Sequence, residues 1–215
     1  YTRVDWDEGQ EAIDPRAPVY YNITGQWSKW NGFAVAPRLD RAPERVIWRD
    51  ASVGWLQKAE DADVFTYRVQ SFDDSPDYFI ARGALREGEQ ITNTNPFQGD
   101  YLWGRSELIE YENEWGRRLQ GALFYPADYD PSKRYPMITY IYEIRSPSVH
   151  SYYVPDETSE YNPAIWTAEG YVVFQPDIVY RDRNPGLSAV EALVPAVNTV
   201  IDMGVADPDA IGLIG

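Results

Sequence analysis

The sequence contains no cysteine and one histidine, His150. Without cysteine the chain forms no disulfide, offers no thiolate to a metal ion and has no thiol nucleophile. A single imidazole is too few for a self-contained zinc site, which gathers several ligands around the ion. No stretch approaches the roughly 18 consecutive apolar residues of a membrane-spanning helix. We therefore expect no metal site and no membrane span.

Positive charge is also scarce, because 19 Lys and Arg residues stand against 34 Asp and Glu residues, a net charge of −15. Binding to nucleic acid depends on fields of Lys and Arg that displace condensed counterions. Anionic lipid likewise attracts basic segments. The charge therefore excludes nucleic acid as a partner and disfavours a membrane surface. Aromatic residues, by contrast, reach 15% of the chain, which indicates a folded protein.

The first ten residues are polar and aromatic and lack the apolar centre of a signal peptide, which is therefore absent or already removed. The lack of cysteine does not decide the compartment. Together with the aromatic β-rich pattern described below, it favours a periplasmic or secreted location, while a cytoplasmic one stays open.

Upstream of about residue 104, short runs of aromatic and β-branched residues alternate with turn-forming clusters. The runs are 32–36, 45–49, 63–69 and 77–81. Such spacing is typical of antiparallel all-β structure, a sandwich or a propeller. In the third run, alternation predicts that Phe65, Tyr67 and Val69 share one face. The segment 93–100, rich in Asn and Gly and containing a proline, is the predicted linker.

Two clusters in this half could suggest binding sites, and each has a plainer interpretation. The acidic cluster lacks the spacing of a calcium-binding loop, so we interpret it as a solvated turn surface. It comprises Asp61, Asp63, Asp73, Asp74 and Asp77. The tryptophans could form a carbohydrate platform, but we interpret them as core residues of the β domain. They are Trp27, Trp30, Trp48 and Trp55.

Downstream of residue 104 the pattern predicts a β-hairpin over 107–125 and then nearly unbroken apolar runs. These runs are 137–142, 171–175 and 211–214, and they are typical of strands covered on both faces. A helix lies between the last two runs, and strand, helix and strand at this spacing predict a parallel sheet.

The helix is predicted from apolar residues at helical spacing. They are Val190, Leu193, Val194, Val197 and Ile201. Ser188 and Glu191 form a potential capping box at its start, and Gly204 suits the position just past its end. Pro195 predicts either a kink or a later start near Val194.

At three places this second half resembles the catalytic domain of the prolyl oligopeptidase family of serine peptidases. Segments 119–126 and 129–136, followed by the strand ending in Tyr142, resemble the entry into that domain. Segment 170–177 resembles its next strand, and 207–215 resembles the strand that delivers the nucleophile. The family joins a β-propeller to an α/β-hydrolase domain.

The resemblance therefore implies that residues 1–103 are the C-terminal part of a propeller-like all-β domain. It also implies that residues 104–215 are the N-terminal part of an α/β-hydrolase peptidase domain, incomplete as given. The implied activity is hydrolysis of short peptides by acyl transfer, without a cofactor. Implied partners are the peptide substrate and the remainder of the hydrolase domain, and a homo-oligomer stays open.

Two residues of this chain match catalytic positions of the family. Gly215 would be the first glycine of the G-x-S-x-G nucleophile elbow, so the serine, the acid and the histidine would follow beyond it. We therefore expect the 215 residues alone to be inactive. Tyr142 would donate its hydroxyl to the oxyanion, the alternative being that its ring packs at a strand end. This sequence differs from the family just after Tyr142, where Glu-Ile-Arg-Ser-Pro stands in place of a small Gly-containing turn.

Other polar residues near these positions have structural interpretations. His150 precedes the nucleophile strand, whereas the triad histidine comes last in chain order, so we expect a surface-loop histidine. We expect Asp177 and Arg181 to pair or cap locally. Glu143 and Arg145 could bind a peptide terminus, an interpretation that we rank below a structural one.

Two other functions stay open from the sequence. The first half of a hydrolase fold does not determine the leaving group, so an esterase or acylaminoacyl-type hydrolase is one alternative. The other is a non-catalytic binding or assembly protein built on the propeller.

Overall fold

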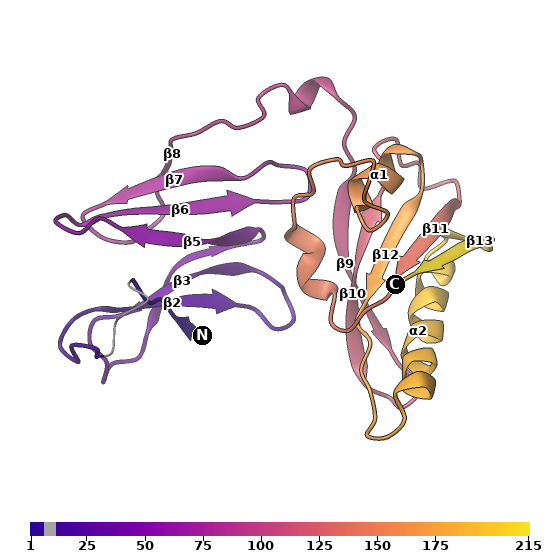
Figure 1. Cartoon of the computed structure of the whole chain (residues 1–215), viewed down its shortest axis with the longest axis horizontal. Coiled ribbons are helices and arrows are strands. Elements are labelled where there is room, and N and C mark those ends of the chain that lie inside the picture. Colours follow the sequence, from indigo (N-terminus) through magenta and orange to yellow (C-terminus); the bar gives the residue numbers. More distant parts are fainter. Residues whose placement is uncertain (7–11) are drawn as a thin grey trace. The chain divides into compact units, whose positions relative to one another are not determined.

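Antiparallel strands make up the first of the two units into which the chain divides, Tyr1–Pro96. The computed structural model describes residues 1–6 and 12–215, and in this unit it has two four-stranded antiparallel sheets (Figure 1). The first sheet consists of β1 (Thr2–Arg3), β2 (Val19–Thr24), β3 (Asn31–Ala36) and β4 (Glu44–Arg49). The second consists of β5 (Ser52–Lys58), β6 (Val64–Gln70), β7 (Asp77–Arg82) and β8 (Glu89–Gln90). Consecutive four-stranded antiparallel sheets are the repeating element of a β-propeller, which confirms the predicted class.

Aromatic rings from both sheets form the core of this unit. Phe65 and Tyr67 are 1% and 0% exposed, as the alternation along β6 predicts. The Tyr67 ring stacks on Phe79 and meets the edge of Phe33 from the first sheet. Its hydroxyl accepts the Gly88 backbone N–H at 2.8 Å, so the one polar atom of the ring is satisfied.

Two interpretations of this unit are wrong in part. Trp27, Trp30 and Trp55 are exposed rather than core residues, and Trp55 has a positive φ of 56° beside a bulge in β5. Asp77 is buried rather than solvated, and its carboxylate accepts hydrogen bonds from Gln90, Thr92 and Thr94. Asp77 also joins burial in raising the pKa of the neighbouring Asp74, with burial the larger cause.

The second unit, Phe97–Gly215, holds a five-stranded mixed sheet in the order β13-β11-β12-β10-β9. Strand β11 pairs parallel with both β12 and β13, and the β9–β10 hairpin adds antiparallel strands at the far edge. The strands are β9 (Arg105–Glu112), β10 (Arg118–Tyr125), β11 (Tyr135–Tyr140), β12 (Val172–Pro176) and β13 (Ala206–Ile214). The helices are the 3-10 turns η1 (Gln98–Asp100) and η2 (Ser146–His150), α1 (Pro163–Ala168) and α2 (Pro185–Asp202). This arrangement confirms the predicted α/β part of the chain.

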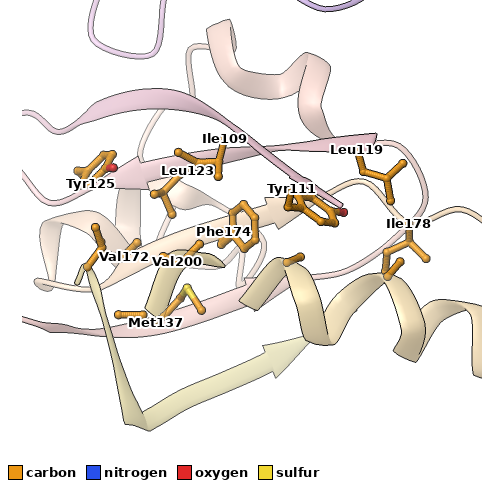
Figure 2. Packing of buried hydrophobic residues seen from close by; sticks show 14 of the residues in the cluster. Ile109, Tyr111, Leu119, Leu123, Tyr125, Met137, Val172, Phe174, Ile178 and Val200 are labelled. Carbon is orange, nitrogen blue, oxygen red and sulfur yellow. The ribbon is translucent and has the colours of Figure 1, made fainter. Parts of the chain in front are cut away.

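Helix α2 covers one face of this sheet, and the apolar side chains between them form the core of the unit (Figure 2). Met137, Phe174 and Val200 are fully buried there. The side chains that alternate with these along the strands point to the other face of the sheet, away from α2. One of them, Phe124, contacts the ring of Tyr153, which follows η2. Side chains from widely separated segments therefore cover both faces, as expected for strands with nearly continuous apolar sequence.

The structure corrects the predicted helix in two respects. Helix α2 begins at Pro185, earlier than the capping box predicts, and the buried Ser188 donates to the Asn184 carbonyl at 2.6 Å. The face against the sheet consists of small residues, Ser188, Ala192, Ala196 and Val200. These small side chains let the helix axis come close to the sheet. Val190 and Val194 lie on a different face of the helix and are therefore exposed. Gly204 has φ +77° just past the helix, as predicted.

Pro195 lies within α2, and a hydrogen bond from outside the helix explains why it is tolerated. Proline has no N–H and leaves the carbonyl four residues earlier, that of Glu191, without its helical donor. The backbone N–H of Glu114, in the β9–β10 turn, donates to that carbonyl at 3.1 Å. The Glu191 carboxylate in turn accepts from Trp115 Nε1 at 2.6 Å. The turn therefore replaces the hydrogen bond that proline removes.

The two units divide between residues 96 and 97, inside the segment predicted as linker. The boundary at 103/104 stays a prediction for the two domains. Among the residues that the structure describes, no helix has the length and hydropathy to cross a membrane.

Gly121 offers a test of how tightly the sheet of the second unit packs. A Cβ at this position would lie 2.5 Å from Phe174 Cε2 and 3.0 Å from Pro176 Cα. We expect Gly121→Ala to lower the free energy of unfolding by about 1–3 kcal/mol, because a buried ring must shift. Urea unfolding followed by tryptophan fluorescence measures the change.

Gly186→Ala in α2 is the matched control, because no atom lies within 4 Å of its Cβ position. Its free energy of unfolding should stay within about 1 kcal/mol of the wild type or rise slightly. Equal losses in the two variants would contradict the proposed role of packing at Gly121.

Candidate functional site

Tyr142 lies just past the carboxyl end of β11, which ends at Tyr140. Its side chain is 64% exposed, so the ring does not pack in the core. Its backbone carbonyl accepts the Tyr180 hydroxyl at 3.0 Å, which ties the residue to the segment after β12. Ligand sites in α/β folds form at the carboxyl ends of parallel strands, and Tyr142 presents its phenol at that edge.

Gly215 follows β13 at the same edge, in contact with the residue before Tyr142. The Ile141 backbone N–H donates to the Ile214 carbonyl at 2.9 Å. A Cβ on Gly215 would lie 2.8 Å from the Ile141 carbonyl oxygen, so only glycine fits without a backbone shift. The structure therefore brings the two matched residues, Tyr142 and Gly215, to neighbouring strand ends.

A buried carboxylate organises the loop that follows Tyr142. Asp177, 6% exposed, comes directly after β12 and accepts the backbone N–H groups of Arg145 and Ser146, each at 2.7 Å. The Ser146 hydroxyl donates to its other carboxylate oxygen, also at 2.7 Å. Asp177 therefore caps a loop about thirty residues earlier in the chain.

This geometry corrects the expected pairing of Asp177 with Arg181. The Arg181 guanidinium pairs instead with the carboxylate of Glu191 on α2 and lies 4.8 Å from the ring centroid of Trp115. It thereby joins α2 to the β9–β10 turn. The local alternative, a cap between nearby residues, is wrong because the loop that Asp177 caps comes from another strand connection.

Further hydrogen bonds anchor the backbone at Asp177 and Ile178. Its N–H donates to the Gln120 carbonyl at 2.8 Å, and the next N–H, of Ile178, donates to the Glu143 carbonyl at 2.7 Å. The Tyr111 hydroxyl donates to the Asp177 carbonyl. Burial, and secondarily the Asp177 charge, raise the pKa of Tyr111, so this phenol stays a donor. Sequence patterns did not indicate this role for Tyr111, because the contact joins residues 66 positions apart.

Arg145 crosses the ends of the two central strands. Its guanidinium carbon lies 4.8 Å from the ring centroid of Tyr140 in β11, and its Nη2 donates to Gln175 Oε1 in β12 at 3.2 Å. Glu143 is exposed at the same loop. His150, expected on the surface, is 9% exposed because it ends the turn η2 against the sheet. Residues 1–6 and 12–215 contain no group of three His, Asp or Glu side chains suited to a metal ion.

No family model matches the chain. A dipeptidyl-peptidase 5 of Aspergillus oryzae is 31% identical over 67 residues, which cover 31% of this chain and 9% of that protein.

Solved structures match over almost the whole chain. The AtxE2 isopeptidase has a TM-score of 0.71 at 14% identity, covering 93% of this chain and 33% of its own. Dipeptidyl peptidase 4 of Porphyromonas gingivalis has a TM-score of 0.70 at 15% identity, covering 94% and 30%. A prolyl endopeptidase structure matches with a TM-score of 0.63 at 12% identity, covering 92% and 30%. The chain thus spans about a third of these structures, and the predicted resemblance and fold are confirmed.

Asp177→Ala tests whether the Asp177 carboxylate holds the loop after Tyr142 in place. The substitution leaves two backbone N–H groups and one hydroxyl without their acceptor. We expect the free energy of unfolding to fall by about 3 kcal/mol, because buried donors lose both partner and water. Hydrogen exchange at the Arg145 and Ser146 amides should accelerate, as mass spectrometry of the loop peptide would show.

Asp130→Ala is the matched control, because the Asp130 carboxylate also accepts a serine N–H and hydroxyl, both from Ser132, but at an exposed site. This variant should lose much less stability and leave exchange at residues 143–148 unchanged. Unaltered exchange in Asp177→Ala would show that the carboxylate does not hold the loop.

Proposed function

Because the chain shares its fold with an isopeptidase, a dipeptidyl peptidase and a prolyl endopeptidase, we propose that it belongs to a serine peptidase of the prolyl oligopeptidase family. The complete protein hydrolyses short peptides by acyl transfer in this proposal. A structure of the isopeptidase with Astexin3-dC4 bound, which also matches with a TM-score of 0.71, supports a peptide substrate. No cofactor takes part.

One observation carries the proposal, namely that Tyr142 and Gly215 lie just past the ends of neighbouring strands, where Gly215 and Ile214 contact Ile141. In α/β-hydrolases the nucleophilic serine sits on a sharp turn after such a strand, within G-x-S-x-G. Gly215 would open that turn, so the serine hydroxyl would emerge beside Tyr142. This is the relative position that a nucleophile and an oxyanion donor need.

The chemistry follows from these positions. The serine oxygen attacks the scissile carbonyl carbon while the triad histidine accepts the serine proton. The carbonyl oxygen gains a negative charge, and the Tyr142 hydroxyl, with a backbone N–H, donates a hydrogen bond to it. When the tetrahedral intermediate collapses, the histidine protonates the leaving amine. Water then releases the acyl group by the same steps.

The loop contacts support this role for Tyr142. An oxyanion donor is effective when it is held in place before the charge develops, because no reorganisation is then needed during the reaction. The Tyr180 hydroxyl holds the Tyr142 carbonyl, and Asp177 holds the two N–H groups of Arg145 and Ser146 that follow. On the other side of Tyr142, the Ile141 N–H donates to the Ile214 carbonyl, so the backbone is held both before and after Tyr142.

Tyr142→Phe in the complete protein tests the oxyanion role. We expect kcat to fall by about 10²- to 10³-fold with little change in KM, because the lost hydrogen bond forms mainly in the transition state. Steady-state hydrolysis of a fluorogenic peptide provides both constants. Tyr101→Phe, at a side chain that is 69% exposed in the same unit, is the control and should leave both constants unchanged.

An unchanged kcat in Tyr142→Phe, with peptide hydrolysis intact, would remove Tyr142 from the mechanism without affecting the proposed peptidase activity.

A fluorophosphonate probe tests the wider proposal. We expect the complete protein to gain the mass of one probe and to hydrolyse peptides, because it would hold an activated serine. Residues 1–215 alone should stay unlabelled, since they contain no G-x-S-x-G motif. Intact-mass spectrometry measures both results. Labelling with hydrolysis of esters only would favour an esterase, and no labelling of the complete protein would favour a binding or assembly role.

A further inference from the structure

The guanidinium of Arg145 lies at the candidate site and has no carboxylate partner within residues 1–6 and 12–215. The residue is half-buried, three positions after Tyr142, and spans Tyr140 and Gln175 at the ends of neighbouring strands. Among the residues described, no Asp or Glu oxygen lies within ion-pair distance of it. Arg118 and Arg181 of the same unit each pair with a glutamate. A half-buried cation without a counter-charge is costly unless an anion joins it.

The carboxylate that contacts the Arg145 backbone is already occupied. Asp177 accepts the backbone N–H of Arg145, but its remaining contacts are the N–H and the hydroxyl of Ser146. Its charge therefore organises the loop and forms no ion pair with the guanidinium.

Gln175 adds a second buried donor to the same place. Its side chain is fully buried, and its Nε2 has no hydrogen-bond partner among the described residues. The orientation of the amide is determined, because arginine only donates and Arg145 Nη2 must therefore face Oε1. Arg145 Nε is likewise buried without a partner in the described part of the chain. Gln175 Oε1 is already engaged by Arg145 Nη2 and the Ser148 hydroxyl, so the two buried donors, Gln175 Nε2 and Arg145 Nε, lack an acceptor among the described residues.

We propose that Arg145 binds a carboxylate of the peptide substrate near the scissile bond, so that the site selects substrates bearing one. The inference rests on the proposed peptidase function. The planar guanidinium can direct parallel N–H donors at both carboxylate oxygens, and a partly buried setting strengthens such a pair. The carboxylate comes either from the C-terminus of a short peptide or from an Asp or Glu side chain.

Matched substrates separate the two sources. One pair of fluorogenic peptides differs only in a free C-terminal carboxylate against an amide, and the other differs only in Glu against Gln beside the scissile bond. With the complete protein, we expect kcat/KM to be about tenfold higher for the charged member of one pair, the range of a charge-assisted hydrogen bond. The pair that shows the preference identifies the source.

Variants assign the preference to Arg145. Arg145→Gln should reduce the ratio of kcat/KM within the pair to about one, whereas Arg145→Lys should retain part of it, because lysine keeps the charge but not the planar geometry. Lys133→Gln removes a positive charge at a side chain that is 68% exposed, and it should leave the ratio unchanged. Should Arg145→Gln fail to fold, the reduced ratio in Arg145→Lys carries the test.

The outcomes distinguish this inference from the proposed function. Peptide hydrolysis with equal kcat/KM in both pairs would overturn the role of Arg145 and leave the peptidase function standing. A preference that persists in Arg145→Gln would do the same, since the guanidinium would then be structural. No hydrolysis of any peptide would overturn the peptidase function and the inference together.

Discussion

The buried carboxylate of Asp177 is the interaction on which the candidate site depends. It satisfies two backbone N–H groups and the Ser146 hydroxyl at the start of the loop after β11. A buried carboxylate is costly unless hydrogen bonds compensate it, and this loop supplies them. In return the loop, Tyr142 included, is tied to the end of β12. Without the carboxylate, an exposed loop would have to hold the Tyr142 phenol by itself.

A second set of contacts joins the hairpin to α2 and keeps the sheet covered. The Glu191 carbonyl, released by Pro195, accepts the Glu114 N–H, and the Glu191 carboxylate binds Trp115 and Arg181. Small residues on α2 then allow close packing on the sheet. The strand ends carrying the site are thus held by a rigid layer, and their spacing is a property of the packed sheet.

Local sequence patterns predicted most of the longer strands but missed β2 and β5, and they predicted the helix less well. Strands such as β6 alternate so regularly that the buried face could be predicted from Phe65 and Tyr67. The helix has two apolar stripes, and periodicity favoured the larger side chains around Val190 and Val194, which are exposed. The sheet selected the stripe of alanines, since close packing depends on the neighbouring surface as well as on hydrophobicity.

The sequence by itself determined the order of an antiparallel β unit and a parallel α/β unit, because strand periodicity and helix spacing are local. The resemblance of its second half to the prolyl oligopeptidase family also indicated Tyr142 and Gly215. Tertiary structure alone decided their neighbourhood. It determines which strands are adjacent, that Asp177 caps a loop from another connection, and that no described carboxylate pairs with Arg145. These features join residues some thirty positions apart. Hydrogen bonds and charge pairs over such separations produce no periodic pattern in the sequence, so they could not be predicted from it.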